Sequence, residues 1–296
     1  MDTADDRHLD SEDFAGELAA GVPQDFEVPP VRCTSFLGDN ALEFYQLTVA
    51  YLADSTGIAT EFISGVPPGE LDRRVNRGAI QVVFTCGLPY VRKADHEPPL
   101  LQLLAAPVML GARYCDRPIY FSDVIVHAES PYGGFEDLRG TTFAYNEVCS
   151  LSGYMLPWYH LHPLAEIDGF FAETIRSGSH AVSMNWVESG RADAAAIDSV
   201  VLEMEISQDS GRARSLRVIE NIGPATMPPV AASTRLSQDL GRCLRQTLLE
   251  MHTTERGRAI LDLGGVRRFA AVTDVDYDPI RGIVRVLQAA GAADLS

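Results

Sequence analysis

Three junctions where a predicted strand runs into a helix or turn carry the polar groups best placed for chemistry. They lie at residues 36–40, 85–90 and 146–154. In the third, Ser150 and Ser152 can cap and begin a helix, while Gly153 lets the backbone approach closely. The first turn of a helix has unpaired N–H groups and the positive end of its dipole. With the two hydroxyls, these groups could hold phosphate, phosphonate or carboxylate oxygens, and plain N-capping is the structural alternative.

Four further polar residues stand at similar places. Ser179 and His180 precede a predicted helix, although a lone histidine is often a surface or packing residue. Asp198 ends an apolar run, where a carboxylate is costly unless it is paired or hydrogen-bonded. It could receive a ligand ammonium group, hold a neighbouring loop or cap the following helix. Glu147 could likewise be either a ligand contact or a structural residue.

A catalytic interpretation is also open. Cys149, His180 and Asp198 could meet in one cleft, and a thiol at a helix N-terminus can be a nucleophile assisted by histidine. The competing interpretation is a buried, inert cysteine. Other catalytic signatures are missing, including GxSxG, HExxH, the P-loop and GxGxxG after a strand. His160 and His162 are two residues apart, which is wrong for two ligands on one helix face, so we expect no metal site and no cofactor.

Elements that would position these residues alternate between strands and helices along the chain. Residues 41–57 have helical spacing, with Leu42, Tyr45, Val49 and Leu52 on one face and Gly57 at the end. Residues 237–265 predict two amphipathic helices broken near Thr253. This alternation predicts α/β layers with helices on both faces of a sheet, where ligands bind beyond the carboxyl ends of strands. Tyr90 and Tyr154 sit at junctions and could line a pocket.

Charge and composition narrow the possible partners. The 296 residues include 41 acidic and 24 basic side chains, for a formal net charge of −17. No broad basic field exists to replace phosphate counterions, so we expect no nucleic-acid or anionic-membrane partner, although local donors can still hold a small anion. Five cysteines without a CxxC pair argue against a disulfide framework and a structural zinc site.

Targeting signals are not evident in the sequence as written. Residues 1–30 are acidic, have no apolar signal core and predict a solvated tail. No apolar stretch approaches the length of a membrane helix. These features predict a cytoplasmic protein. A signal at the true N-terminus would instead place it in the periplasm or at the cell surface.

A family resemblance rests on several pieces that stand in one order. They are YLADSTG, VVFTCGLPYV, FEDLRGTTFAYNEVCSLSGYMLP, SGSH, ESGRADAAAIDSVV, GPATMPPVAAS and YDPIR. From about residue 36 to residue 281 the chain resembles the phosphate/phosphite/phosphonate solute-binding proteins of ABC transporters, the PhnD-like family. The resemblance implies a two-lobed type II periplasmic-binding-protein fold, an α/β fold of mixed sheets flanked by helices, with the ligand cleft between the lobes. Lobe 1 would comprise residues 31–120 and 222–296, lobe 2 residues 121–221, with crossovers near 120–126 and 216–220.

The same resemblance implies a binding site. Oxyanion contacts would come from Ser150, Ser152, Gly153, Ser179 and His180, and Tyr90 would come from the opposite lobe. Glu147 and Asp198 would face any ammonium group on the ligand. The ligand would be a small anionic or zwitterionic solute, phosphonate-like or phosphate-like.

Three roles follow from these observations. The resemblance implies the solute-binding component of an ABC uptake system with a permease partner, or a cytoplasmic derivative of one. The first alternative is a cytosolic enzyme on the same scaffold that uses Cys149 and His180 on a small metabolite. The second is a cytoplasmic ligand sensor that uses the acidic tail as a partner contact.

Overall fold

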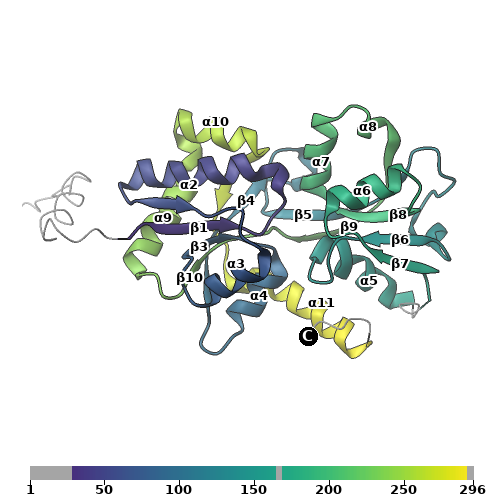
Figure 1. Ribbon diagram of the computed structural model, residues 1–296, viewed down its shortest axis with the longest axis horizontal. Helices are drawn as coiled ribbons and strands as arrows, with labels where there is room; N and C mark the ends of the chain where they lie inside the picture. Colours follow the sequence, from purple (N-terminus) through teal and green to yellow (C-terminus); the bar gives the residue numbers. More distant parts are fainter. Residues whose placement is uncertain (1–28, 165–168, 292–296) are drawn as a thin grey trace, which may run out of the picture. The chain divides into compact units, whose positions relative to one another are not determined.

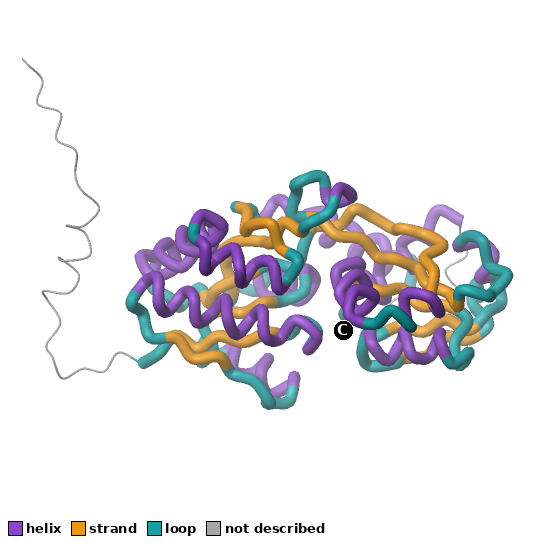
Figure 2. The backbone as a smooth tube through the Cα atoms, turned by 90° about the horizontal axis from the view of Figure 1, so that it is seen from above, coloured by secondary structure: helices purple, strands orange, loops and turns teal. Residues whose placement is uncertain are grey.

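Two mixed β-sheets flanked by helices make up the protein (Figures 1 and 2). The computed structural model describes residues 29–164 and 169–291. The predicted acidic tail falls almost wholly on residues 1–28, which lie outside the described part. The two mixed sheets and the helices that flank them confirm the predicted α/β class.

The first sheet has six strands in the order β11-β4-β10-β3-β1-β2. The strand β1 pairs in parallel with β2 and β3, while β10 is antiparallel to β3 and β4, and β11 is antiparallel to β4. Helices α2, α9 and α10 cover one face, and α3 and α4 lie on the other (Figure 1). The strands are β1 (Val31–Ser35), β2 (Thr60–Phe62), β3 (Val82–Phe84), β4 (Leu101–Met109), β10 (Val230–Ser233) and β11 (Val266–Ala270). The helices are α2 (Leu42–Thr56), α3 (Pro68–Asn76), α4 (Gly87–Ala94), α9 (Gln238–Glu250) and α10 (Glu255–Leu263), with 3₁₀ turns η1 (Asp39–Ala41), η2 (Ala112–Tyr114), η6 (Met251–Thr253) and η7 (Asp274–Tyr277).

The second sheet has five strands in the order β7-β6-β8-β5-β9. The strand β6 pairs in parallel with β7 and β8, and β5 runs antiparallel to β8 and β9. Helices α6, α7 and α8 lie on one face, with the π-helical turn η4 and α5 on the other (Figure 1). The strands are β5 (Ile119–His127), β6 (Thr142–Tyr145), β7 (Glu173–Arg176), β8 (Ala194–Asp198) and β9 (Leu216–Thr226). The other elements are η3 (Phe135–Leu138), η4 (Leu151–Met155), α5 (Leu156–Leu161), η5 (His162–Leu164), α6 (His180–Glu188), α7 (Ser199–Gln208) and α8 (Arg212–Ser215).

Local sequence explains where the predicted helices begin and end. The helix α2 buries Tyr45, Val49 and Leu52 on its inner face, as their spacing predicts. It ends at Gly57, which adopts a left-handed conformation with φ of 69°. The expected break near Thr253 is also present, because α9 gives way to η6 before Thr254 caps α10.

Two strands carry the chain between the sheets. After β4 and η2 the chain enters the second sheet through β5, and β9 returns it towards β10. These two strands pair antiparallel from Ile119 opposite Thr226 to His127 opposite Leu216. The predicted lobe boundaries at 120/121 and 221/222 fall inside these strands and stay a prediction.

The last helix, α11 (Asp278–Ala289), contacts elements that belong to both sheets. It buries Ile280, Ile283 and Leu287 and packs against α4 on one side and α5 and η4 on the other. Accordingly, buried residues from both sheets form one continuous apolar cluster. Within the described residues, no helix is both long and apolar enough to cross a membrane.

Three elements differ from the sequence-based expectation. Residues 87–94 form α4, although Gly87 and Pro89 predict a turn there. Proline is tolerated in a first helical turn, because the N–H that it lacks would have no partner in the helix. The short strands β7 and β11 were also not predicted. The strand β7 has mostly exposed side chains, so no run of buried residues marks it in the sequence.

Candidate functional site

Four helical segments each follow a strand along the chain, and their first turns lie in one region. Cys86 precedes α4, Ser150 precedes η4, Ser179 precedes α6 and Asp198 precedes α7. Burial raises the pKa of Cys86 to about 12, and the nearby charges of Asp198 and Cys149 add to the shift. The start of α4, from the first sheet, therefore lies near two junctions of the second.

Three of the predicted site residues act as N-caps. Ser150 Oγ accepts a hydrogen bond from Gly153 N at 3.0 Å, and Ser179 Oγ accepts one from Val182 N at 3.2 Å. Asp198 Oδ1 accepts one from Val200 N at 2.8 Å. These contacts match the capping interpretation. Each serine still has a hydroxyl proton that it can donate.

Ser152, Gly153 and His180 lie together around Asn146. His180 Nε2 is 3.3 Å from Asn146 Nδ2 and 3.5 Å from Ser152 Oγ. A Cβ atom placed on Gly153 would lie 1.9 Å from Asn146 Oδ1 and 3.1 Å from His180 Cε1. The absence of a side chain at residue 153 is what lets Asn146 and His180 approach the helix start.

The His180 imidazole is neutral at neutral pH. Burial lowers the pKa of His180 to about 4, and the backbone of Ala196 only partly opposes this shift. Because Asn146 Nδ2 can only donate, a hydrogen bond between these groups makes Nε2 the acceptor and places the ring proton on Nδ1. His180 can therefore orient hydroxyl and amide groups, but it supplies no positive charge.

Asp198 is the acidic group at the centre of this region. Burial raises the pKa of Asp198 to about 7, while the N–H groups of Val200 and Val201 oppose the shift. The charges of Asp123 and Glu203 raise the pKa further. At neutral pH this carboxyl group therefore exists in both protonation states.

Three residues that the sequence did not single out as ligand contacts lie within electrostatic reach of Asp198. They are Tyr45, Tyr120 and Cys86. Burial raises the pKa of both tyrosines above the usual value, and the charge of Asp198 adds to each shift. Tyr45 and Tyr120 look like core aromatics in the sequence, and both are in fact buried. Cys86 falls in the junction at residues 85–90, which is the signal that could have identified it.

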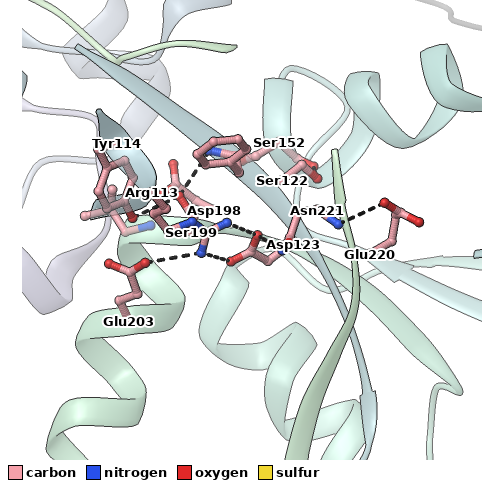
Figure 3. A network of polar contacts seen from close by, with 12 residues as sticks. Arg113, Tyr114, Ser122, Asp123, Ser152, Asp198, Ser199, Glu203, Glu220 and Asn221 are labelled. Carbon is pink, nitrogen blue, oxygen red and sulfur yellow. Dashed lines mark hydrogen bonds and ion pairs between the residues drawn. The ribbon is translucent and has the colours of Figure 1, made fainter. Parts of the chain in front are cut away.

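An ion pair with a buried carboxylate, Asp123, lies near Asp198 (Figure 3). Arg113 donates to both carboxylate oxygens of Asp123, at 2.9 and 2.7 Å, and to Glu203 at 3.2 Å. Asn221 Nδ2 donates to Asp123 Oδ1 at 2.7 Å. Arg113 follows β4 of the first sheet, whereas Asp123 and Glu203 belong to β5 and α7, so this ion-pair network joins the two halves beside the site.

Glu147 and Tyr154 have partners of their own. Glu147 forms an ion pair with Arg176. The Tyr154 ring stacks on Trp158, with ring centroids 4.3 Å apart, and lies 4.9 Å from Tyr145. Both residues are therefore held by neighbours in the second sheet.

The side-chain contacts of Tyr90 are with residues near the carboxyl-terminal helix, not with the other predicted site residues. Its hydroxyl donates to Asp274 Oδ1 at 2.8 Å, and its ring is 4.8 Å from that of Tyr277. It also lines a separate cavity of about 320 Å³ together with Asp274, Gln102 and apolar residues. The structure therefore groups Ser150, Ser152, Gly153, Ser179, His180 and Asp198, and it places Tyr90 apart from them.

Cys149 lacks the features of an activated thiol. Burial raises the pKa of Cys149, and the charge of Glu147 adds to the shift, although Arg92 and Arg176 act in the opposite direction. A thiol with a raised pKa carries little thiolate at neutral pH. The neutral His180 offers no imidazolium to stabilise a thiolate. Within residues 29–164 and 169–291, no group of three or more His, Cys, Asp or Glu side chains is placed to hold a metal ion.

Comparison with known proteins places this geometry in a family. The family model described as ABC transporter, phosphonate, periplasmic substrate-binding protein matches residues 34–277. Among solved structures, the chain is similar to the binding-protein component of an ABC phosphonate transporter from Pseudomonas aeruginosa. That likeness has 18% sequence identity and a TM-score of 0.78, and covers 89% of this chain and 88% of the other. A second similar structure is PhnD1 from Prochlorococcus marinus in complex with methylphosphonate, with 19% identity and a TM-score of 0.76 over 87% of this chain and 98% of that one. The TM-scores of these two comparisons show that the chain shares the two-lobed fold.

Proposed function

Because this chain belongs to the family of periplasmic phosphonate substrate-binding proteins of ABC transporters, we propose that it binds a compact phosphonate-like anion around Asp198. The observation that carries this proposal is that Ser152 Oγ lies 3.5 Å from His180 Nε2, although the two residues come from separate junctions. Asp198, from a third junction, and Ser152 both act on the pKa of Tyr120. The methylphosphonate bound by the Prochlorococcus protein supports the same ligand class.

Helix starts and hydroxyl groups can hold such an anion without a direct salt bridge. Each helix start has unpaired N–H groups and a positive dipole end, worth about 0.3–1 kcal/mol for a nearby negative charge. Here α4, η4, α6 and α7 begin in one region, and Ser152 adds a hydroxyl. Arg92, whose charge reaches Cys149, adds positive potential at the margin, whereas Arg176 is already paired with Glu147. Local dipoles of this kind explain how a chain of net charge −17 can bind an anion.

Asp198 determines which anions fit. An ionised carboxylate repels a fully ionised oxyanion, but one shared proton turns the contact into a charge-assisted hydrogen bond. A phosphonate monoanion carries that proton, and at neutral pH a protonated Asp198 could supply it to a dianion. Sulfate carries no proton near neutral pH and can pair only with the protonated form of Asp198, so it should bind more weakly than methylphosphonate. Glu147 is already paired with Arg176, so a neutral alkyl substituent suits this region better than an ammonium group.

Isothermal titration calorimetry tests the proposal. The ligands are methylphosphonate, phosphite, phosphate and sulfate at pH 7, with Asp198→Asn as the test variant. Asp239→Asn is the matched control, because Asp239 is 83% exposed and pairs with Arg242 on the surface of α9. We expect methylphosphonate to bind more tightly than sulfate. Asp198→Asn should weaken methylphosphonate binding about tenfold or more, the loss of a charged hydrogen bond worth about 1.5–3 kcal/mol. No binding of any of the four at millimolar concentration would contradict the proposal.

The transport role is part of the same proposal. The family is periplasmic, which replaces the expectation of a cytoplasmic protein. We infer that the chain works outside the cytoplasmic membrane and delivers its ligand to an ABC permease. Cell fractionation with an antibody against the chain should find it in the periplasmic or surface fraction. Deleting its gene should abolish uptake of labelled methylphosphonate, and unchanged uptake would contradict the transport role.

A further inference from the structure

A second polar cavity lies on the first sheet, outside the four junctions of the proposed ligand site. Its volume is about 390 Å³, and its lining residues come from the region of the edge strand β2 and the carboxyl-terminal end of α3. Its lining residues are Arg32, Glu61, Ile63, Arg74, Arg77, Ala79 and Ile80. The lining therefore carries three guanidinium groups and one carboxylate.

Nearby carboxylates neutralise these arginines only in part. Arg32 Nε lies 3.2 Å from Glu61 Oε2, and Arg74 Nε lies 2.9 Å from Glu70 Oε1. Arg77 reaches the same Glu70 oxygen only at 3.8 Å, and Arg73 also pairs with Glu70. One Glu70 carboxylate thus serves three arginines.

Most guanidinium donors in the cavity remain available. Within the described part of the chain, Arg32 and Arg74 contact carboxylates through the Nε–H of each. Their terminal N–H groups are left for a bound ligand. The side chains of Arg32, Arg74 and Arg77 are 47%, 40% and 68% exposed, so a solute can reach them. Arg235 adds a further positive charge, because it donates to the Arg77 carbonyl at 2.7 Å. In a chain of net charge −17 this is a locally basic cavity.

The chemistry of the donors indicates the ligand. Guanidinium groups recognise phosphate oxygens through paired, parallel hydrogen bonds. Cavities of about 300–1,000 Å³ hold ligands of drug size, so this one is larger than a single tetrahedral anion needs. Ile63, Ala79 and Ile80 supply an apolar wall that a single phosphate would leave unused.

We propose that this cavity is a second binding site that takes a polyphosphate anion, such as pyrophosphate or the phosphate chain of a nucleotide. The three arginines hold the phosphate oxygens, and Glu61 and Glu70 hold the arginines in place. This site is separate from the proposed phosphonate site, and its occupation does not require Asp198.

Titration with pyrophosphate, ATP and inorganic phosphate tests the second site. The test variant is Arg32→Gln/Arg77→Gln, which spares Arg74 because Arg74 pairs with Glu70 within α3. Arg242→Gln is the control, since the Arg242 side chain is 74% exposed on another helix. Thermal unfolding checks that each variant folds.

We expect pyrophosphate and ATP to bind the unaltered chain, and to bind about tenfold or more tightly than inorganic phosphate because they can contact more arginines. The double variant should lose about tenfold or more in pyrophosphate affinity, and affinity should fall as salt rises. ATP binding tighter than pyrophosphate would assign a role to the apolar wall, and equal affinities would assign recognition to the phosphates alone; either result supports the site.

Two results would overturn this proposal. One is no pyrophosphate or ATP binding at millimolar concentration, and the other is equal pyrophosphate affinity for the double variant and the Arg242→Gln control. Asp198→Asn separates this site from the first, because that variant should bind pyrophosphate as the unaltered chain does.

Discussion

Gly153 offers a sharp test of the site, because its missing side chain is the space that Asn146 occupies. In Gly153→Ala the new Cβ would lie 1.9 Å from Asn146 Oδ1 and 2.8 Å from Asn146 Cγ. Since no real Cβ contact is this short, Asn146 must move. Overpacking of this kind costs about 1–3 kcal/mol. Losing the contact between Asn146 and His180 adds about 1 kcal/mol, and alanine in a helical backbone recovers about 0.5–1 kcal/mol.

The net expectation for Gly153→Ala is a loss of about 1–3 kcal/mol in the free energy of unfolding. Urea denaturation measures this loss, and the melting temperature should fall by about 2–4 °C for each kcal/mol. Binding of methylphosphonate should weaken as well, because the displaced Asn146 contacts His180, which in turn lies close to Ser152. The matched control is Gly69→Ala in α3, where a Cβ would meet nothing within 4 Å. That change should be neutral or stabilising by up to about 1 kcal/mol.

A double-mutant cycle makes the reasoning refutable. Asn146→Ala removes the atoms that a Cβ on residue 153 would strike, so in that background Gly153→Ala should cost much less. If Gly153→Ala is as stable as Gly69→Ala, the clash has no energetic weight. If its cost is unchanged without the Asn146 side chain, the clash is not its cause.

Three further expectations concern charge and reactivity. Burial raises the pKa of Asp198 to about 7, well above the usual value of an aspartate, so between about pH 4 and 7 the folded state holds a proton that the unfolded state has lost. The contribution of Asp198 to stability should therefore decline as pH rises through this range, and Asp198→Asn should flatten that slope in unfolding experiments. Alkylation of Cys149 at neutral pH should be slower than that of the exposed Cys243, as mass spectrometry of the labelled protein can measure. Arg113→Met should lower the free energy of unfolding by about 3 kcal/mol, because it leaves the buried Asp123 carboxylate without its cation.

Controls and contrary results are specific to each of these. A stability–pH slope between pH 4 and 7 that survives Asp198→Asn would show that other groups cause it. Faster labelling of Cys149 than of Cys243 would revive the catalytic interpretation of Cys149 and His180. Arg242→Met is the control for Arg113, since exposed ion pairs contribute about 0–1 kcal/mol, and equal losses in both variants would contradict the role of the buried pair.

Local signals in the sequence predicted most of the elements. Gly57 ends α2 where predicted, because a glycine after an apolar helical face is a local signal. The short α4 was missed, because Gly87 and Pro89 indicate a turn when only near neighbours are considered. Whether such a segment becomes helical depends on packing against α11, which comes nearly two hundred residues later.

The residues of the candidate site also fall into those with a local signal in the sequence and those without one. Ser150, Ser179 and Asp198 were predictable, because a polar residue between a buried strand and a helix is a local capping pattern. Tyr45 was not, since an aromatic residue on the inner face of a helix looks like core. Tyr90 pairs with Asp274, 184 residues away, and no local pattern indicates that partner.

The placement of α11 constrains how the two halves of the protein can move. A hinge at β5 and β9 would let the sheets rotate freely only if no other element contacted both. Because α11 packs against α4 on one side and against α5 and η4 on the other, rotation must slide this helix along one of those surfaces. Sliding between packed helices is limited to small shears, whereas a bare hinge allows large swings. We therefore predict that the last helix of the described chain limits rotation between the two sheets through the packing of Ile280, Ile283 and Leu287.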